Sequence, residues 1–114
     1  MKRILAPILL LTLLFPPLAL GEEVKIEDLV KRDGLYYPKF SEVPFTGKVT
    51  GNYQGKIKDG KRHGPWVKYH ENGQLSAKGT FKDGGRDGPW VWYNEDGTVD
   101  EEYTGPFKDG VKVE

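Results

Sequence analysis

Aromatic and β-branched residues alternate with short polar, glycine-rich segments along most of the chain. Residues 35–37 and 45–49 form two such apolar runs, with Pro38 and Pro44 lying between them. Proline cannot donate a ladder hydrogen bond, so its position favours an edge strand or a loop for these two runs. From residue 35 onward the pattern therefore predicts strands and turns rather than helices.

The same pattern of hydrophobic and polar positions returns at a fixed spacing. The tract Gly64-Pro65-Trp66-Val67-Lys68-Tyr69 recurs as Gly88-Pro89-Trp90-Val91-Trp92-Tyr93. The tract Phe81-Lys82-Asp83-Gly84 recurs as Phe107-Lys108-Asp109-Gly110, with two residues added to the spacing, and begins a third copy. A fixed period of this length is typical of repeat proteins, in which each copy is one supersecondary unit and neighbouring copies bury a shared core.

Two kinds of turn are expected within each copy. Asn72-Gly73 and Asp96-Gly97 are strong signals for tight hairpins, because a type I′ turn needs positive φ at both central residues. Residues 58–64 and 82–88 are longer, polar and glycine-rich, and they predict wide turns. The order strand, tight turn, strand, wide turn predicts an all-β fold, an elongated antiparallel β-meander of hairpin repeats.

The position of the first tight turn also predicts which residues face each other. With a two-residue loop at Asn72-Gly73, Trp66 faces Gly79, and the same count places Trp90 opposite Tyr103. An aromatic side chain over a strand glycine protects exposed backbone. Apolar groups are expected on both faces of this sheet, so that curvature, the N-terminal segment or a partner must cover them.

Residues 1–21 have the features of a cleaved signal peptide. Lys2 and Arg3 form a basic start, residues 4–15 are apolar, and Ala19-Leu20-Gly21 places small residues at the cleavage site. The apolar run is short and contains proline, so a retained membrane anchor is the weaker alternative. No cysteine follows the run, which excludes a lipoprotein. We therefore expect an exported protein, periplasmic or secreted.

The remaining chain divides into a lead-in and a repeat domain. Residues 22–34 form the lead-in, and residues 35–114 form the hairpin repeat domain. Ile26, Leu29 and Val30 have helical spacing and Gly34 follows them, so the lead-in is expected to be a short helix or an extended segment.

Charge and composition exclude several classes of partner and site. Without Lys2 and Arg3, 15 of the 17 basic side chains remain against 17 acidic ones, a formal charge of −2. Nucleic acids and anionic membranes are bound by clustered positive charge, so neither is expected as the main partner. The chain has no cysteine, which excludes disulfides, thiol catalysis and thiolate metal sites.

The repeated motif combines glycines, a Gly-Pro-Trp tract and an aromatic residue three positions after the tryptophan. Its residues are Gly64, Trp66, Tyr69, Asn72, Gly73, Lys82, Asp83, Gly84 and Gly88, then Trp90, Tyr93, Asp96, Gly97, Lys108, Asp109 and Gly110. This motif resembles the MORN-variant repeat, over about residues 26–110. Residues 33–37 and 44–48 resemble the opening of a bacterial group of such proteins, commonly catalogued as antitoxins of toxin–antitoxin systems. The resemblance implies a hairpin-repeat fold and an antitoxin-like or immunity role.

Residues of the types used in catalysis are few and poorly placed. His63 and His70 lie in or beside predicted turns, and neither Ser41 nor Ser76 has a nucleophile motif around it. Three aspartates recur at matched turn positions, where they favour backbone hydrogen bonds: Asp59, Asp83 and Asp109. Residues 100–102 are acidic but would alternate between the faces of a strand, which disfavours a calcium site. We expect no enzymatic activity, no catalytic residue, no cofactor and no metal.

The aromatic residues of the copies are the candidate binding residues: Trp66, Trp90, Trp92, Tyr69 and Tyr93. For four of them, Trp66, Trp90, Tyr69 and Tyr93, a position in the core of the repeats is the favoured expectation. Trp92 differs because its counterpart is Lys68, so that this position tolerates a charge and is expected to be exposed, although it could instead cover the sheet against the C-terminal strand. Four glycines are expected at turns or in structural positions: Gly64, Gly73, Gly88 and Gly97.

Two classes of function are compatible with these observations. The first is an exported, non-catalytic module that binds a protein partner by a face or an edge of its sheet, antitoxin-like or immunity-like. The alternative is an envelope protein that binds a glycan or a lipid through exposed aromatic residues. The sequence does not identify the protein partner, and self-association is a further alternative.

Overall fold

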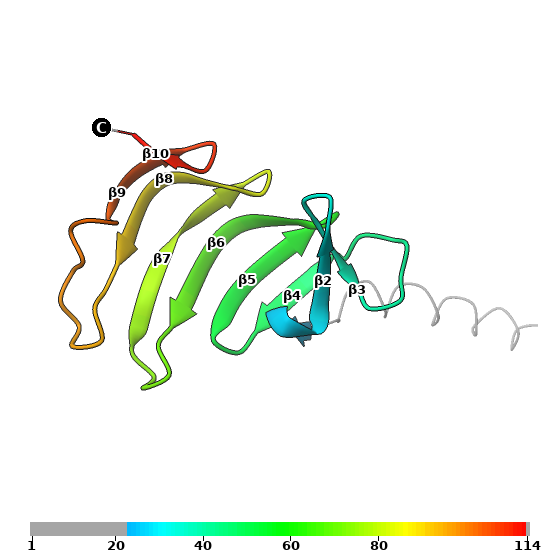
Figure 1. Cartoon of the computed structure of the whole chain (residues 1–114), viewed down its shortest axis with the longest axis horizontal. Helices are drawn as coiled ribbons and strands as arrows, with labels where there is room; N and C mark the ends of the chain where they lie inside the picture. The colour runs from blue at the N-terminus through cyan, green and yellow to red at the C-terminus, as the bar shows by residue number, and fades with distance from the viewer. Residues whose placement is uncertain (1–22, 114) are drawn as a thin grey trace, which may run out of the picture.

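The computed structural model describes residues 23–113, which form ten strands and one short 3-10 helix (Figure 1). The expected signal peptide and its cleavage site lie outside these residues. The elements are β1 (Glu23–Lys25), η1 (Ile26–Asp28), β2 (Leu29–Arg32), β3 (Leu35–Pro38), β4 (Gly47–Thr50), β5 (Tyr53–Lys58), β6 (Lys61–Tyr69), β7 (Leu75–Lys82), β8 (Gly85–Trp92), β9 (Gly105–Lys108) and β10 (Val111–Lys112). Within the described part of the chain, no helix has the length and hydropathy of a membrane span.

Eight of the strands form one sheet in the order β1-β4-β5-β6-β7-β8-β9-β10. From β4 onward each strand pairs antiparallel with the next, and only β1 joins in parallel, beside β4. The predicted all-β meander is therefore confirmed. Strands β2 and β3 form a separate hairpin, which crosses in front of the first strands of the sheet in Figure 1.

The N-terminal part differs from the expectation in two respects. The lead-in is extended apart from η1, so the helix alternative is reduced to a single 3-10 turn. Strand β4 lies between β1 and β5, so its predicted edge position is wrong. The expected boundary between residues 34 and 35 falls inside the β2–β3 hairpin, whose Arg32 pairs with Leu35.

The two-residue turns lie at the Asp-Gly dipeptides of the predicted wide turns, so that prediction is wrong. Lys58 pairs directly with Lys61, and Lys82 pairs with Gly85, which leaves only Asp-Gly between the strands. Both residues of each dipeptide have positive φ, as a type I′ turn requires: Asp33 51° and Gly34 81°, Asp59 49° and Gly60 84°, Asp83 50° and Gly84 87°, and Asp109 52° and Gly110 86°. Aspartate tolerates this region better than most residues, which explains its recurrence.

The turns at Asn72-Gly73 and Asp96-Gly97 are three-residue loops, and the type I′ prediction for them is wrong. Only the glycines have positive φ, 90° at Gly73 and 93° at Gly97. The Gly73 amide donates to the His70 carbonyl at 2.9 Å, and the His70 amide donates to the Gln74 carbonyl at 2.8 Å. This is a type I turn followed by a glycine in the left-handed region, the usual three-residue hairpin loop.

The second of these loops contains a carboxylate whose pKa depends on one neighbouring side chain. Oδ1 of Asp96 accepts hydrogen bonds from the Thr98 hydroxyl at 2.6 Å and the Thr98 amide at 3.0 Å. These bonds, the hydroxyl first, lower the Asp96 pKa below its usual 3.8. Because the folded pKa is lowered, the stabilisation is complete above pH 3.8 and is lost as pH falls through the folded pKa.

We expect the Thr98→Val variant to raise the Asp96 pKa toward 3.8, as measured by NMR titration of the carboxyl carbon. The Thr98→Ser variant keeps the hydroxyl and is expected to keep the low pKa. An unchanged pKa in Thr98→Val would show that the hydroxyl is not its main cause.

The Gly-Pro-Trp tract forms a bulge in each copy. Gln54 pairs with Val67 and Lys56 pairs with His63, so residues 64–66 of β6 lie opposite Gly55 alone. Gly64 has a φ of 80°, which a residue with a side chain adopts at a cost. Gly64 was expected at a turn or in a structural position. In the structure it is a bulge residue, not a turn residue.

The second copy repeats the bulge. Residues 88–90 of β8 lie opposite Gly79, and Gly88 has a φ of 79°. Proline suits the middle position of each bulge because it has no amide hydrogen to leave unpaired.

Each bulge places an indole ring flat against the preceding strand. Trp66 pairs with Gly79 as predicted, but its ring lies over Gly55, and its Nε1–H donates to the Lys56 carbonyl at 3.0 Å. Trp90 in turn covers Gly79, and its Nε1–H donates to the Thr80 carbonyl at 2.9 Å.

The predicted pairing of Trp90 with Tyr103 is wrong. Trp90 pairs with Gly105, because residues 100–104 leave the ladder and the third copy contains two extra residues.

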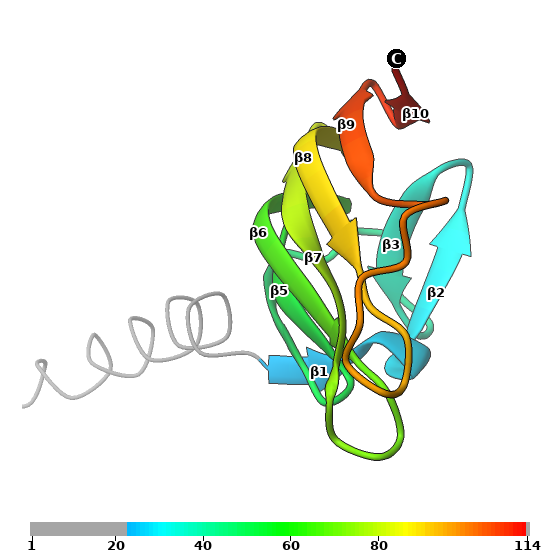
Figure 2. The same ribbon diagram turned by 90° about the vertical axis from the view of Figure 1, so that its left-hand side faces the viewer.

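The buried side chains of β5 to β8 share one face of the large sheet. Directly paired residues lie on the same face of a sheet. Gly64 pairs with Phe81, and Ala77 pairs with both Lys68 and Trp92, so these residues of β6, β7 and β8 share a face. The buried core consists of Leu29, Phe45, Val49, Ile57, Trp66, Ala77, Phe81 and Trp90. Figure 2 shows the β2–β3 hairpin beside one face of the sheet, and Leu29 brings it into this core.

Candidate functional site

A continuous series of aromatic rings crosses the sheet from β6 to β9. Ring centroids are 5.8 Å apart between Trp66 and Phe81 and 5.0 Å apart between Phe81 and Trp90, both in edge-to-face geometry. Trp92 continues the series, 5.4 Å from Trp90 and 5.6 Å from Phe107. Edge-to-face and offset pairs at these distances attract one another beyond the burial of their area. We call the face that carries these five rings the aromatic face.

The structure brings three of the five predicted binding residues together. Trp66, Trp90 and Trp92 belong to the aromatic face, and the first two are buried. Tyr69 and Tyr93 are half-buried and lie outside the ring series. Their backbone amides connect neighbouring segments instead. The Tyr69 amide donates to the Asn52 carbonyl and the Tyr93 amide donates to the Ser76 carbonyl, each at 2.8 Å.

Trp92 is half-buried, so the prediction that it is exposed is wrong. It packs against the core beside Trp90 and Phe107, and the Tyr103 ring lies 6.5 Å away. Lys68, its counterpart in the first copy, remains exposed. The difference follows from the neighbours, because residues 100–104 and β9 flank the second copy and supply Tyr103 and Phe107.

Two arginines, which the sequence analysis placed in wide turns, lie on the aromatic face. Arg62 pairs with Ile57, and Arg86 pairs with Phe81. The guanidinium carbons of Arg62 and Arg86 lie 4.2 and 6.0 Å from the Phe81 ring centroid. The Arg86 guanidinium also lies between 5.1 and 5.9 Å from the rings of Trp90, Trp92 and Phe107. Such positions over ring faces attract a cation.

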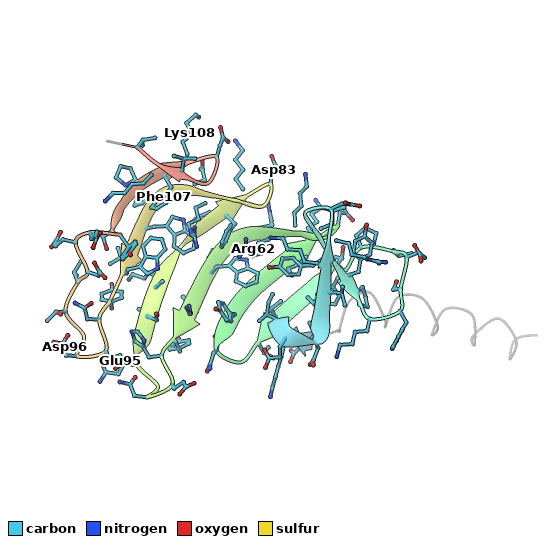
Figure 3. The ribbon with its side chains drawn as sticks, viewed as in Figure 1. Arg62, Asp83, Glu95, Asp96, Phe107 and Lys108 are labelled. Atoms are coloured by element: carbon cyan, nitrogen blue, oxygen red, sulfur yellow. The ribbon has the colours of Figure 1, made fainter. Side chains whose placement is uncertain are left out.

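A cleft of about 190 Å³ opens between these groups. Both arginines line it, together with Lys68 and the rings of Phe81 and Trp90, and none of its lining residues is acidic. Figure 3 shows Arg62 over the strands, Asp83 at one end of them, and Glu95 and Asp96 at the other end. Within residues 23–113 the single ion pair joins Lys48 to Glu23 at 3.9 Å, on β4 and β1.

Arg86 is therefore a partly buried cation that lacks an acidic partner in the described chain. Its Nε is buried and has no hydrogen-bond partner among these residues. Burial, and to a lesser extent the charge of Arg62, lower the Arg86 pKa from its ordinary value. The guanidinium remains charged at neutral pH all the same.

The other residues considered for chemistry have structural contacts. Nε2 of His70 lies 2.9 Å from the Tyr93 carbonyl, to which it donates, and so ties the first three-residue loop to the next strand. Ser76 is buried in β7. In the described part of the chain, no group of three histidine or acidic residues is placed to hold a metal ion.

Two segments of the chain, residues 62–83 and 86–105, match the family described as MORN repeat variant. Each segment begins at an arginine and spans one copy, the first over β6 and β7 and the second from β8 to the first residue of β9. No curated protein and no solved structure matches the chain significantly. The chain is thus a hairpin-repeat protein in which two copies match the MORN repeat variant.

Proposed function

We propose that this chain is an exported, non-catalytic repeat protein that binds a protein partner through the aromatic face. The observation that carries this proposal is that, beyond its N-terminal strands, side chains of the sheet itself are all that cover the face among the described residues. In Figure 1 the β2–β3 hairpin crosses in front of β4, whereas no other described segment crosses β6 to β9. Clustered tryptophan, tyrosine and arginine side chains are typical of the energetically dominant centre of protein interfaces.

The rim of this face supports the same function. Tyr53 and Tyr103 flank the cleft region and are exposed, 37% and 56% respectively. Buried indoles form the floor, held by the hydrogen bonds of Trp66 and Trp90. A rigid aromatic floor with a mixed aromatic and cationic rim loses little conformational entropy when it binds a partner.

Replacing Trp92 with lysine is expected to reduce partner capture by about tenfold or more, because Trp92 joins the floor to the Tyr103 rim. The measurement is capture from envelope extract by the tagged chain that begins at Glu22. It is made at a temperature at which circular dichroism shows Trp92→Lys to be folded, since Trp92 also packs on the core. Val43→Lys is the matched control: it adds the same charge at a 69% exposed position between β3 and β4.

Equal capture by wild type and Trp92→Lys would refute binding through this face. If soluble envelope glycan abolishes capture and the tagged chain retains no protein, the glycan alternative is favoured. If lipid vesicles retain the chain, the lipid alternative is favoured. Binding of an exported toxin, as the antitoxin resemblance implies, would be one case of the proposed function.

Export itself is part of the proposal, and its support is the sequence of residues 1–21. We expect the protein recovered outside the cytoplasm to begin at Glu22, as determined by intact mass. A full-length chain found only in the cytosol would contradict export. That result would not bear on binding through the aromatic face, which the capture experiment tests separately.

A further inference from the structure

We propose that Arg62 and Arg86 together bind one carboxylate of the partner, a glutamate or aspartate side chain in an extended segment whose neighbouring residues are apolar. This inference rests on the proposed function and specifies the class of segment bound. It concerns the cleft between β6 and β8, which the two arginines line from the strands on either side of β7.

The first support is an unused donor. Nε of Arg86 is buried and donates to no atom of the described chain. Buried polar groups in native proteins are paired with few exceptions, and a guanidinium has five donors in a fixed planar arrangement. Because Nε itself is buried, a partner's carboxylate would pair with the terminal N–H groups of the guanidinium, and it accepts two such bonds in parallel.

The second support is the charge balance of the cleft. Arg62 lowers the pKa of Arg86, so the two cations lie close enough to repel each other. Lys68 adds a third cation to the lining, and the lining contains no acid. The acidic residues labelled in Figure 3 lie at the turns, at the two ends of the strands. An anion placed between the arginines would therefore remove repulsion as well as form new contacts.

The third support is the size and lining of the cleft. A volume of about 190 Å³ is below the roughly 300–1,000 Å³ of typical small-ligand pockets, and it suits a single side chain. Phe81 and Trp90 provide apolar walls beside the arginines, so an apolar residue next to the acid would also be buried.

The arrangement of the rings favours a peptide over a membrane. The indoles of Trp66 and Trp90 lie flat on glycines of the preceding strands, with 4% of each residue exposed. Rings held in this way do not protrude, and insertion into a bilayer requires protruding apolar groups. We therefore assign the anion to a peptide carboxylate.

The test uses two immobilised libraries of short peptides. One has glutamate fixed at the centre among varied neutral residues, and the other has glutamine at the same place. We expect the wild-type chain to be retained about tenfold more strongly by the glutamate library, because only the carboxylate pairs with both arginines. Arg86→Gln and, separately, Arg62→Gln are expected to remove this preference. Either substitution also removes a repulsion, so both variants should fold.

Arg32→Gln is the matched control. Arg32 lies on β2 with its guanidinium carbon 4.0 Å from the Tyr37 ring centroid, outside the cleft, so the control should keep the glutamate preference. A second measurement observes the terminal guanidinium N–H groups of Arg86 by NMR. Their protons are expected to move downfield when the best-retained peptide is added, as new hydrogen bonds form.

Each remaining outcome overturns the inference. Equal retention by the two libraries, or no retention by either, excludes a carboxylate peptide, while Trp92-dependent capture of a partner would leave the proposed function standing. A glutamate preference that survives both Arg62→Gln and Arg86→Gln would place the site elsewhere. Retention by phosphatidylglycerol vesicles that depends on Arg86, without a glutamate preference, would assign the anion to a lipid.

Discussion

Replacing Trp90 with alanine is expected to lower the free energy of unfolding by about 3–5 kcal/mol. The side chain is 4% exposed, its ring contacts Phe81 and Trp92, and its Nε1–H satisfies the Thr80 carbonyl. Removal leaves a cavity at the centre of the aromatic face and uncovers the backbone of Gly79. Urea unfolding followed by circular dichroism measures the change.

Tyr103→Ala is the comparison for this variant. Tyr103 contacts the same ring series but is 56% exposed, so its removal is expected to cost about 1 kcal/mol or less. A Trp90→Ala loss no larger than that of Tyr103→Ala would contradict the position of Trp90 in the core.

Replacing Gly79 with alanine is the second substitution with a large expected effect, a loss of about 2–3 kcal/mol. A Cβ at this position would lie 2.1 Å from Cδ2 of Trp90, far inside contact distance. The indole cannot simply move away, because its hydrogen bond to Thr80 and its contacts with Phe81 hold it in place. Alanine is otherwise acceptable in a strand, so the cost arises from the ring alone.

Lys78→Ala, one position earlier on the same strand and exposed, is the control and is expected to change stability by about 0.5 kcal/mol or less. The cost of Gly79→Ala should also fall sharply in a Trp90→Leu background, because residues in contact are not additive. The same cost in both backgrounds would show that the ring is not the cause.

The repeat period of the sequence is sufficient to predict the all-β meander. The turn types are not predicted correctly, because the two-residue and the longer turns exchange places between sequence and structure. Asn72-Gly73 and Asp83-Gly84 carry the same local signal for a tight hairpin, and both contain a residue in the left-handed region. They are distinguished by pairing across the strands: Lys82 pairs directly with Gly85, whereas the β6–β7 register shifts between Lys68 and Tyr69, beside the Asn72-Gly73 loop. A bulge changes the register by adding residues to one strand, and counting outward from a turn does not detect it.

The same error hid part of the candidate site. Because the composition of residues 58–64 and 82–88 predicts wide turns, it places Arg62 and Arg86 in loops, whereas the structure places them on β6 and β8, facing the rings. A usable signal was present, since both arginines follow Asp-Gly by two positions and recur at the period of the repeat. The tryptophans were found because the motif repeats them. The exposure of Trp92 was misjudged because it was inferred from Lys68, whose neighbours differ.

The stacking of each indole on the strand before it gives the sheet a direction. Trp66 lies over Gly55 and Trp90 over Gly79, so each of these two indoles is seated on the strand that precedes its own. A copy added at the C-terminal side would leave the glycine floors of Trp66 and Trp90 unchanged, whereas loss of β5 would leave Trp66 without its floor. Such asymmetry allows the binding surface to lengthen in one direction over evolution without redesign of the parts already in place.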